Sequence, residues 1–411
     1  MELELKDKYV VILGANVLNI GVIDKLKAMG FKVIAVDFRE EINLPCDEHI
    51  VFDAKNPEIA SVLKQKGFKN IKAVYTSMDN AGIAQRAICK EFGLLFADED
   101  AVLNAHHKDK MQKKWAEAGI LNRESFALEN FNTKKIQAFN SKFKIIIKPS
   151  NACASRGITI LEKNSSIKLL EKAFDYAKEN SSNGFVNIEE FIIGTEYTVE
   201  MLGDNYGNVS VFGISKKYHT ENADNNKICN KSHYNPKDID DETQNKLADA
   251  GVKCYKALGL KNTLGHLEII IKENGELSPV EMGSRSSGFI ASHLVDLTSG
   301  KSYLKTFIDV LNGKKVKNGL LPQKNISSMY FFYDITADST SKSNVYLMNF
   351  INYQIKSLYS DRKNLLKDKF FNKLTQDTDR YGYEILVGDK DILTIEEVKK
   401  AEKEFLKEFL K

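Results

Sequence analysis

The stretch from Gly265 to Gly288, GHLEIIIKENGELSPVEMGSRSSG, constrains the fold more than any other part of the chain. It predicts a β-hairpin, because Asn and Gly tolerate the positive φ angles of a type I′ turn and apolar residues flank Asn274-Gly275 on both sides. If those two residues form the loop, Glu268 lies directly opposite Glu281 on the neighbouring strand. The two carboxylates then project from the same face of the hairpin.

Two facing carboxylates need a counter-charge, because like charges in such a pair destabilise a hairpin. Mg²⁺ takes carboxylate oxygens and shares them with substrate phosphates, so we predict that Glu268 and Glu281 hold a divalent cation. Glu273 and Glu276 would pair at the tip and face water, and a hairpin whose acids are all solvated is the alternative.

Arg285 and the Ser-Ser-Gly turn after it predict an anion site beside the metal. The opposite, buried face is predicted to comprise Ile269, Ile271, Val280 and Met282.

The length and composition of the chain limit its class. Its 411 residues exceed one ordinary hydrophobic core, so roughly two to four domains are expected. The net charge is only +3, with basic and acidic residues mixed, which argues against nucleic-acid binding. No apolar run approaches the length of a membrane span, and the first residues do not resemble a signal peptide. Five cysteines without a CxxC pair argue against a disulfide scaffold or a zinc site, so a cytoplasmic location is expected.

The first hundred residues have the alternating pattern of an open α/β sheet. Apolar runs at 9–13 and 32–36 flank a helical pattern that ends at Gly30, and further strands are predicted at 50–52 and 73–75. A dinucleotide-binding domain is one interpretation. The glycine fingerprint G-x-G-x-x-G is absent, however, and a single strand-terminal acid, Asp37, is commonly a cap or turn residue. NAD binding is therefore not favoured.

The middle of the chain has features that suit a nucleotide. Residues 144–149 (KIIIKP) and 157–161 (GITIL) predict two strands, joined by a loop of small residues that is longer than usual. Its backbone N–H groups would cover phosphates while Lys148 supplies a positive charge; an ordinary exposed loop is the alternative. Residues 185–197 (FVNIEEFIIGTEY) offer an apolar slot for a base, a backbone edge and an acid for ribose hydroxyls. An edge strand with solvated acids is the alternative there.

In this order and spacing, the features resemble the ATP-grasp superfamily, and most of all its carboxylate–amine ligase branch. LGANVLNIGVIDKLKAMGFKVIAVD is similar to the biotin-carboxylase-like N-terminal domain, and DRYGYEILVGD is similar to the C-terminal segment. The resemblance extends over essentially the whole chain. It implies an α/β N-terminal open sheet, then an α+β ATP-grasp domain whose two subdomains clamp ATP, then a small α+β C-terminal domain. The expected boundaries are 1–104, 105–318 and 319–411.

The resemblance also implies roles for individual residues. Two lysines and the loop after the second would contact the phosphates of ATP: Lys110, Lys148, Ser155 and Gly157. The nucleoside would lie against Glu189 at the adenine, the backbone of Phe191 and Ile192, and Glu196 at the ribose. Lys216 would approach the terminal phosphates or the substrate, and Arg285 would bind the acid or its acyl phosphate. Glu268 and Glu281 would hold Mg²⁺ or Mn²⁺.

One position departs from the pattern of the superfamily. Many members carry E-x-N-x-R, with the Asn as a further metal ligand, where this chain has Glu281-Met-Gly-Ser-Arg285. Gly283 offers no side-chain ligand, so the metal would depend on the two glutamates, phosphates and water. The number of Mg²⁺ ions is left open.

The activity implied is that of an ADP-forming ligase. It would use ATP to convert a small carboxylate, an amino acid among the candidates, into an acyl phosphate and join it to an amine. A purine-pathway-like carboxylase or formate-activating enzyme, an NAD-dependent oxidoreductase and a nucleotide-binding regulatory protein without turnover are the alternatives. No nucleic-acid or membrane partner is expected, and the identity of the acid and amine and a homodimeric state are left open.

Overall fold

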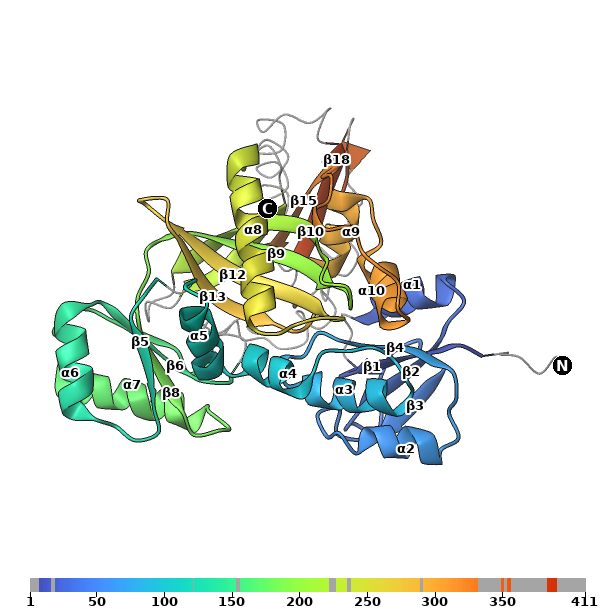
Figure 1. The fold of residues 1–411 in the computed structure, drawn as a ribbon, viewed down its shortest axis with the longest axis horizontal. Helices are drawn as coiled ribbons and strands as arrows, with labels where there is room; N and C mark the ends of the chain where they lie inside the picture. The colour runs from blue at the N-terminus through green and yellow to red at the C-terminus, as the bar shows by residue number, and fades with distance from the viewer. Residues whose placement is uncertain are drawn as a thin grey trace, which may run out of the picture.

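The computed structural model describes residues 7–15, 19–120, 122–152, 156–221, 227–234, 238–288, 291–331, 349–350, 353–355 and 383–389. Three β-sheets organise these residues (Figure 1). In that view the N-terminal sheet lies at the lower right, a small sheet lies at the left, and a large sheet fills the centre. None of the helices in the described part of the chain combines the length and the apolar character that crossing a bilayer requires.

The N-terminal sheet is parallel, with strand order β3-β2-β1-β4, and it confirms the predicted open α/β pattern. Its strands are β1 (Tyr9–Leu13), β2 (Lys32–Asp37), β3 (Glu48–Val51) and β4 (Ile71–Thr76). One face packs on α2 (Ile59–Gln65) and α3 (Gly82–Glu91), and the other face packs on α1 (Ile20–Ala28) and α10 (Tyr303–Leu311). Helix α10 comes from the far end of the chain, so the N-terminal sheet shares a hydrophobic core with later elements.

Asp37 at the end of β2 is already satisfied by the protein. Its Oδ2 accepts from the Ala15 backbone N–H at 2.9 Å, and its Oδ1 accepts from Arg39 Nε at 2.8 Å. Burial would raise the pKa of this carboxyl, but the Arg39 guanidinium holds the pKa below its usual value. Because both carboxylate oxygens of Asp37 already accept hydrogen bonds from the protein, Asp37 does not support NAD binding.

The small sheet carries polar residues on one face and apolar residues on the other. Its strand order is β5-β8-β6-β7, all antiparallel, with β5 (Ser125–Leu128), β8 (Val186–Glu190), β6 (Ile145–Pro149) and β7 (Thr159–Leu161). Helices α6 (Thr133–Lys142) and α7 (Ile167–Glu179) cover the apolar face, where Ile147 and Ile188 join the core. Strand alternation therefore turns Lys148 and Glu189 to the other face.

The large sheet contains the predicted hairpin. Its path is β13-β12-β9-β10-β11-β15-β18-β17-β16, and β14 pairs with β10. The strands are β9 (Gly194–Gly203), β10 (Val209–Glu221), β11 (Lys227–Tyr234), β12 (Leu264–Lys272), β13 (Leu277–Gly283), β14 (Gly319–Leu320), β15 (Asn325–Phe331), β16 (Asn349–Phe350), β17 (Tyr353–Ile355) and β18 (Tyr383–Asp389). Residues 191–193 connect β8 to β9 and so link the small sheet to the large one.

Helices cover one face of the large sheet. Trp115 of α5 (Lys108–Glu117) and Tyr255 of α8 (Asp241–Ala257) are fully buried in the same core as Val199 of β9 and Leu267 of β12. Helix α4 (Glu99–His106) contributes to this core as well. Helix α9 (Ala291–Ser299) precedes α10 near the N-terminal sheet. Helices thereby close this apolar face. On the opposite face, Leu202 and Leu264 share a core with α9 and α10, and Glu200 and His266 lie two residues away along the same strands.

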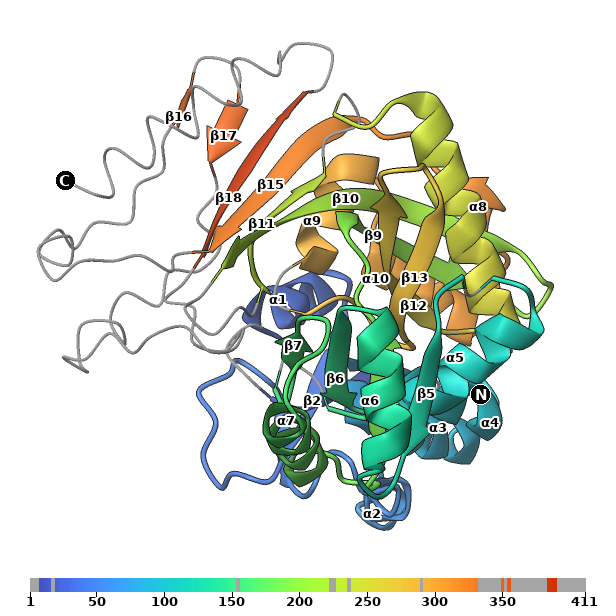
Figure 2. The ribbon, with the colours of Figure 1, turned by 90° about the vertical axis from the view of Figure 1, so that its left-hand side faces the viewer.

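The C-terminal elements extend the large sheet rather than forming a separate one among the described residues. Strand β15 pairs with β11, and β18 pairs with β15, as Figure 2 shows at its upper left. The sequence predicts strands at 328–333 and 383–387, and β15 and β18 overlap these segments. It also predicts a charged helix at 395–410, which lies outside the described residues.

The hairpin has the predicted cross-strand pair but not the predicted loop. Glu268 lies opposite Glu281, whereas Lys272 N–H donates to Glu276 O at 2.9 Å, so the loop is Glu273-Asn274-Gly275. The predicted pairing of Glu273 with Glu276 is therefore wrong. Among the three loop residues only Gly275 has a positive φ, of 80°, and one such residue is what a three-residue loop needs. The longer loop shifts the pairing by one residue, and an extra residue on β13, at the register shift between Glu268 and Ile269, shifts it back. Glu268 therefore still pairs with Glu281.

Tyr255 is predicted to contribute to stability through its hydroxyl. The hydroxyl donates to Thr263 O at 2.7 Å and accepts from Gly203 N–H at 3.3 Å, in a fully buried position. Tyr255→Phe should lower the free energy of unfolding by about 1–2 kcal/mol, because buried backbone groups lose a partner. Urea denaturation measures this. Tyr206→Phe is the matched control, since Tyr206 is 56% exposed; an equal loss in both variants would contradict the role of the buried hydroxyl.

Candidate functional site

The face of the large sheet opposite α8 carries a row of ionisable residues, which we call the charged face. Cross-strand pairing places Glu200 of β9 beside His266 of β12, and Thr198 beside Glu268, so these side chains share one face. The members of the charged face are Glu196, Glu200, Lys217, His219, His266, Glu268 and Glu281. Charged residues gathered on a partly enclosed sheet face are a candidate functional site.

Lys217 connects two acids of the charged face. Its Nζ lies 2.7 Å from Glu268 Oε1 and also forms an ion pair with Glu196. Glu196 Oε2 lies 3.2 Å from His219 Nε2. Burial would raise the pKa of Glu268, but Lys217 and His266 hold the pKa well below its usual value. The carboxylate is therefore charged at neutral pH.

His266 adds a second positive charge next to Glu268. Its Nδ1 lies 2.6 Å from Glu200 Oε1, and its Nε2 lies 3.8 Å from Glu268 Oε1. Burial alone would lower the pKa of His266, but the Glu200 carboxylate raises it to about 9. His266 is thus protonated at neutral pH, and it balances the fully buried Glu200.

Lys108 holds the other member of the carboxylate pair. Its Nζ lies 3.0 Å from Glu281 Oε1 and donates to Ala152 O at 3.0 Å. Burial would lower the pKa of Lys108, but Glu281 raises it. Each of the two facing carboxylates therefore has its own lysine, one from α5 and one from β10.

The two facing carboxylates fit a divalent cation. Their side chains are 27% and 28% exposed, so their oxygens are accessible, and hard cations prefer oxygen ligands. Within the described ranges no group of three or more His, Cys, Asp or Glu side chains could hold a metal. A cation bound by Glu268 and Glu281 would thus take its remaining ligands from phosphates and water, which is the usual coordination of Mg²⁺ at nucleotides.

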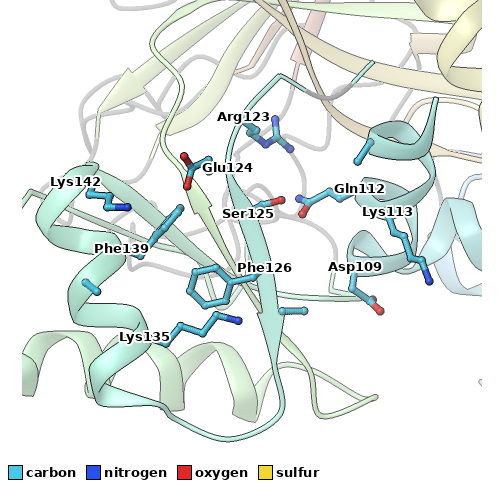
Figure 3. Close-up of a pocket in the computed structure, with 13 residues that line it drawn as sticks. Asp109, Gln112, Lys113, Arg123, Glu124, Ser125, Phe126, Lys135, Phe139 and Lys142 are labelled. Atoms are coloured by element: carbon cyan, nitrogen blue, oxygen red, sulfur yellow. The ribbon is translucent and has the colours of Figure 1, made fainter. Parts of the chain in front are cut away.

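The small sheet contributes a buried charge cluster that faces the large sheet. Lys148 Nζ lies 2.8 Å from Glu189 Oε1, and Arg123 Nη2 lies 3.0 Å from Glu189 Oε2. Gln112 of α5 also donates to Glu189. Figure 3 shows Arg123 and Gln112 on different elements beside β5, at a groove of about 630 Å³. Glu189 therefore has two cations and an amide as partners.

The electrostatics of this cluster follow from its burial. The side chains of Lys148 and Glu189 are only 5% and 2% exposed. Burial lowers the pKa of Lys148, although Glu189 opposes this shift. Burial would raise the pKa of Glu189, but Lys148 and Arg123 hold it below its usual value. The lysine predicted to bind phosphates is thus paired with the glutamate predicted to contact adenine.

Two predicted lysines do not point into the site. Lys110 is exposed, because the buried stripe of α5 contains Lys108, Met111, Gln112 and Trp115. Lys216 pairs with the buried Tyr197, and its Nζ lies 5.4 Å from the Tyr218 ring, so it lies on the face opposite Glu268. Helix periodicity and strand alternation instead turn Lys108 and Lys217 toward the carboxylates. These positions correct the placement expected for Lys110 and Lys216.

The loop after Lys148 is only partly described. Strands β6 and β7 form the predicted antiparallel pair, and Ser155 lies outside the described residues. Gly157 has a φ of +72°, and a Cβ atom there would lie 2.6 Å from Pro149 Cγ, so glycine is required. Lys108 N–H donates to Ser150 O at 2.9 Å, which ties the start of the loop to α5.

The segment predicted to contact the base lies between the two sheets. Phe191 and Ile192 follow the last residue of β8 and precede β9. Phe191 N–H donates to Lys144 O at 2.9 Å, and Lys144 Nζ lies 5.2 Å from the Phe191 ring. Glu189 and Glu196 flank this segment, one on each sheet. The structure thus brings the four predicted nucleoside residues to one junction.

Arg285 is engaged with the N-terminal part of the chain. Its guanidinium forms an ion pair with Asp79, which follows β4, and its Nη1 donates to Ser286 O at 2.7 Å. A Cβ atom at Gly283 would lie 3.1 Å from Arg285 Cγ and 3.3 Å from Asp79 Oδ1. An Asn side chain at this position would crowd the ion pair, which gives a physical reason for the glycine. Sequence reasoning missed Asp79, whose one signal is its place after a strand of the N-terminal sheet.

Comparison with known proteins identifies related chains. The family profile of the ATP-grasp domain matches residues 141–293. The alanine–anticapsin ligase of Bacillus subtilis is 25% identical over 294 residues, which cover 66% of this chain and 62% of that protein. The D-alanine–D-alanine ligase of Halalkalibacterium halodurans is 26% identical over 270 residues, which cover 62% of this chain and 78% of that protein. The match thus spans less than two thirds of the alanine–anticapsin ligase.

Solved structures extend the likeness to most of the chain. The L-amino acid ligase from Bacillus licheniformis superposes with a TM-score of 0.70, covers 98% of both chains and is 17% identical. At this identity the likeness is one of fold.

Lys108 is predicted to stabilise the protein more than Lys110. Lys108→Met should lower the free energy of unfolding by about 1–3 kcal/mol, because Glu281 loses its buried partner; the effect is below that of a fully buried pair since Glu281 is 28% exposed. Lys110→Met should change it by less than about 0.5 kcal/mol, because Lys110 is exposed. Chemical denaturation without divalent cations measures both, and equal effects would contradict the assigned orientation of α5.

Proposed function

Because the chain carries an ATP-grasp domain over residues 141–293 and shares the ATP-grasp fold, we propose that it is an ATP- and Mg²⁺-dependent, ADP-forming carboxylate–amine ligase. One observation carries the proposal: Glu268 and Glu281 face each other across β12 and β13, with lysines at both. This arrangement suits the phosphates of a nucleotide and its metal.

The proposed reaction has two steps. First, a carboxylate oxygen of the acid attacks the γ-phosphorus of ATP, and ADP leaves with the electrons of the broken P–O bond. Second, the amine nitrogen attacks the acyl carbon, phosphate leaves, and the nitrogen loses a proton. Phosphoryl transfer of this kind depends mainly on positioning and on charge stabilisation. The protein is therefore expected to contribute cations and rigid hydrogen-bond donors rather than a covalent group.

The described residues can be assigned to these tasks. Lys148, Lys108 and Lys217 would neutralise the phosphates, and Glu189, Glu196 and the backbone at 191–192 would hold the nucleoside. A bound Mg²⁺, held by Glu268 and Glu281, would neutralise developing charge on the phosphates. Arg285 would bind the acid or its acyl phosphate, because its planar fork matches such groups. Because Arg285 pairs with Asp79, the acid would bind beside the N-terminal sheet.

The substrate class follows from the relatives. The alanine–anticapsin ligase, the D-alanine–D-alanine ligase and the L-amino acid ligase are named for joining amino acids or their analogues. We therefore propose an amino acid as the acid, the amine or both. ADP release over pairs of amino acids and small carboxylates, followed by mass spectrometry of the products, tests this. A purine-pathway-like carboxylase or a formate-activating enzyme would respond to bicarbonate or formate in the same screen.

The proposed domains are an N-terminal domain at 1–104, an ATP-grasp domain at 105–318 and a C-terminal domain at 319–411. The separate parallel sheet supports the first domain, and the profile match at 141–293 supports the second. Strands β15 and β18 belong to the large sheet, so the last boundary would assign strands of one continuous sheet to two domains.

Glu281→Gln should lower Mg²⁺-dependent ADP release by roughly 100-fold or more, because the metal supplies several kcal/mol of charge stabilisation. The hairpin should remain folded by circular dichroism. Glu273→Gln is the control, since Glu273 lies in the exposed loop and should retain full activity. If Glu281→Gln keeps normal Mg²⁺ dependence, the metal site is not where we propose.

Arg285 and the order of bond formation can be tested together. With the correct acid and no amine, hydroxylamine should trap a hydroxamate while ADP accumulates. Arg285→Lys should raise the KM for the acid about tenfold and change the ATP affinity little, because a lysine lacks the two-pronged fork. Omitting the acid is the control. Formation of AMP and pyrophosphate would contradict both the acyl phosphate and the proposed ligase class.

A further inference from the structure

Arg123 is a buried cation that joins the two sheets and has no task in the proposed reaction. Its side chain is 2% exposed and lies just before β5. Nη2 contacts Glu189 at 3.0 Å, and Nη1 donates to Pro279 O at 2.6 Å. Nη2 also approaches Val280 O at 3.4 Å. A buried charge is retained only when it is paired and hydrogen-bonded, so these contacts fix the guanidinium firmly.

One end of Arg123 controls the charge balance at Glu189. Glu189 is shared by Lys148 at 2.8 Å and Arg123 at 3.0 Å. If Lys148 turns to a phosphate, Glu189 loses one of these two cations. Arg123 and Gln112 then remain as its partners. Without Arg123, Lys148 would be the one cation left at this buried carboxylate beside the neutral Gln112, so Glu189 would hold Lys148 away from the nucleotide.

The other end of Arg123 lies at the irregularity of β13. Pro279 pairs with Ile269 while Glu281 pairs with Glu268, so Val280 is the extra residue of the bulge. Arg123 donates to the carbonyl oxygens of Pro279 and Val280, which are the two residues before Glu281. The guanidinium therefore fixes the backbone from which Glu281 projects.

We infer that Arg123 is a positioning residue for the nucleotide and metal sites: it releases Lys148 from Glu189 for phosphate binding and holds the bulge that presents Glu281. The inference rests on the proposed function, because it assumes that Lys148 contacts a phosphate. Through these contacts Arg123 couples the small sheet to β13, the strand that carries Glu281.

The first test is a double-mutant cycle between Arg123 and Glu189. The dissociation constant for MgATP is measured by calorimetry without an acid substrate, so that no turnover occurs. Arg123→Ala should weaken binding roughly 10- to 100-fold in the wild-type background, the size expected for a lost hydrogen bond to a buried charge. In the Glu189→Gln background the same change should cost less than about threefold, because no carboxylate retains Lys148. A purely structural role would weaken binding equally in both backgrounds.

The second test is chemical rescue. The groove of about 630 Å³ is lined by Arg123, Gln112 and Ser125, so a small cation can reach the space left by Arg123→Ala (Figure 3). Millimolar guanidinium should restore MgATP affinity to Arg123→Ala and should not restore it to Lys148→Ala. Arg123→Lys, which keeps the charge but lacks the fork, should fold and bind MgATP with intermediate affinity.

The outcomes separate this inference from the proposed function. If the wild type binds MgATP and Arg123→Ala binds it equally well, or if the loss is the same in both backgrounds without rescue, the inference is wrong while the ligase proposal stands. If Arg123→Ala does not fold, Arg123→Lys decides: wild-type affinity in that variant overturns the requirement for a fork. A wild-type protein that neither binds MgATP nor releases ADP with any acid overturns both.

Discussion

The need to pair every buried carboxylate organises this site. Glu189, Glu268 and Glu281 project toward one region from two different sheets, and each is held by a lysine within 3.0 Å. Without a cation the 2% exposed Glu189 would cost several kcal/mol, and Glu268 and Glu281, which are 27% and 28% exposed, would cost less. The lysines therefore contribute to folding as well as to any activity. The lysines come from α5, β6 and β10. The Lys108–Glu281 pair joins α5 to the large sheet, and Gln112 joins α5 to Glu189 of the small sheet.

The same pairing would be compatible with the proposed nucleotide site. ATP would bring negative phosphates and Mg²⁺ would bring positive charge, so binding both would let the charged side chains exchange partners. In the proposed reaction the lysines would transfer from carboxylates to phosphates, and Mg²⁺ would replace them at the paired glutamates. Besides its contact with Glu189, Arg123 donates to Pro279 O, Val280 O and Ser278 Oγ of β13. In the proposed exchange it would keep these contacts while the lysines change partners.

Sequence reasoning located the carboxylate pair although it misplaced the loop. The loop has one residue more than predicted, and the bulge at Val280 offsets this difference, so Glu268 still faces Glu281. Local turn chemistry predicts the hairpin, whereas the carbonyl oxygens at the bulge accept hydrogen bonds from Arg123, which is distant in sequence. Lysine orientation was harder to predict. Whether Lys108 or Lys110 points inward depends on where the helix packs, and an error of one residue along a strand exchanges Lys216 for Lys217.

Residues whose importance arises only from distant partners gave no local signal. Arg123 lies in an ordinary loop, and Asp79 follows a strand as many acids do. Their partners, Glu189 and Arg285, are 66 and 206 residues away.

Gly283 shows how such a contact constrains the sequence nearby. Its missing side chain leaves room for Arg285 to meet Asp79, so the position that could have carried another metal ligand instead permits an ion pair with the N-terminal part of the chain. The cation proposed at the paired glutamates would then depend more heavily on ligand oxygens, which would link its affinity to the nucleotide.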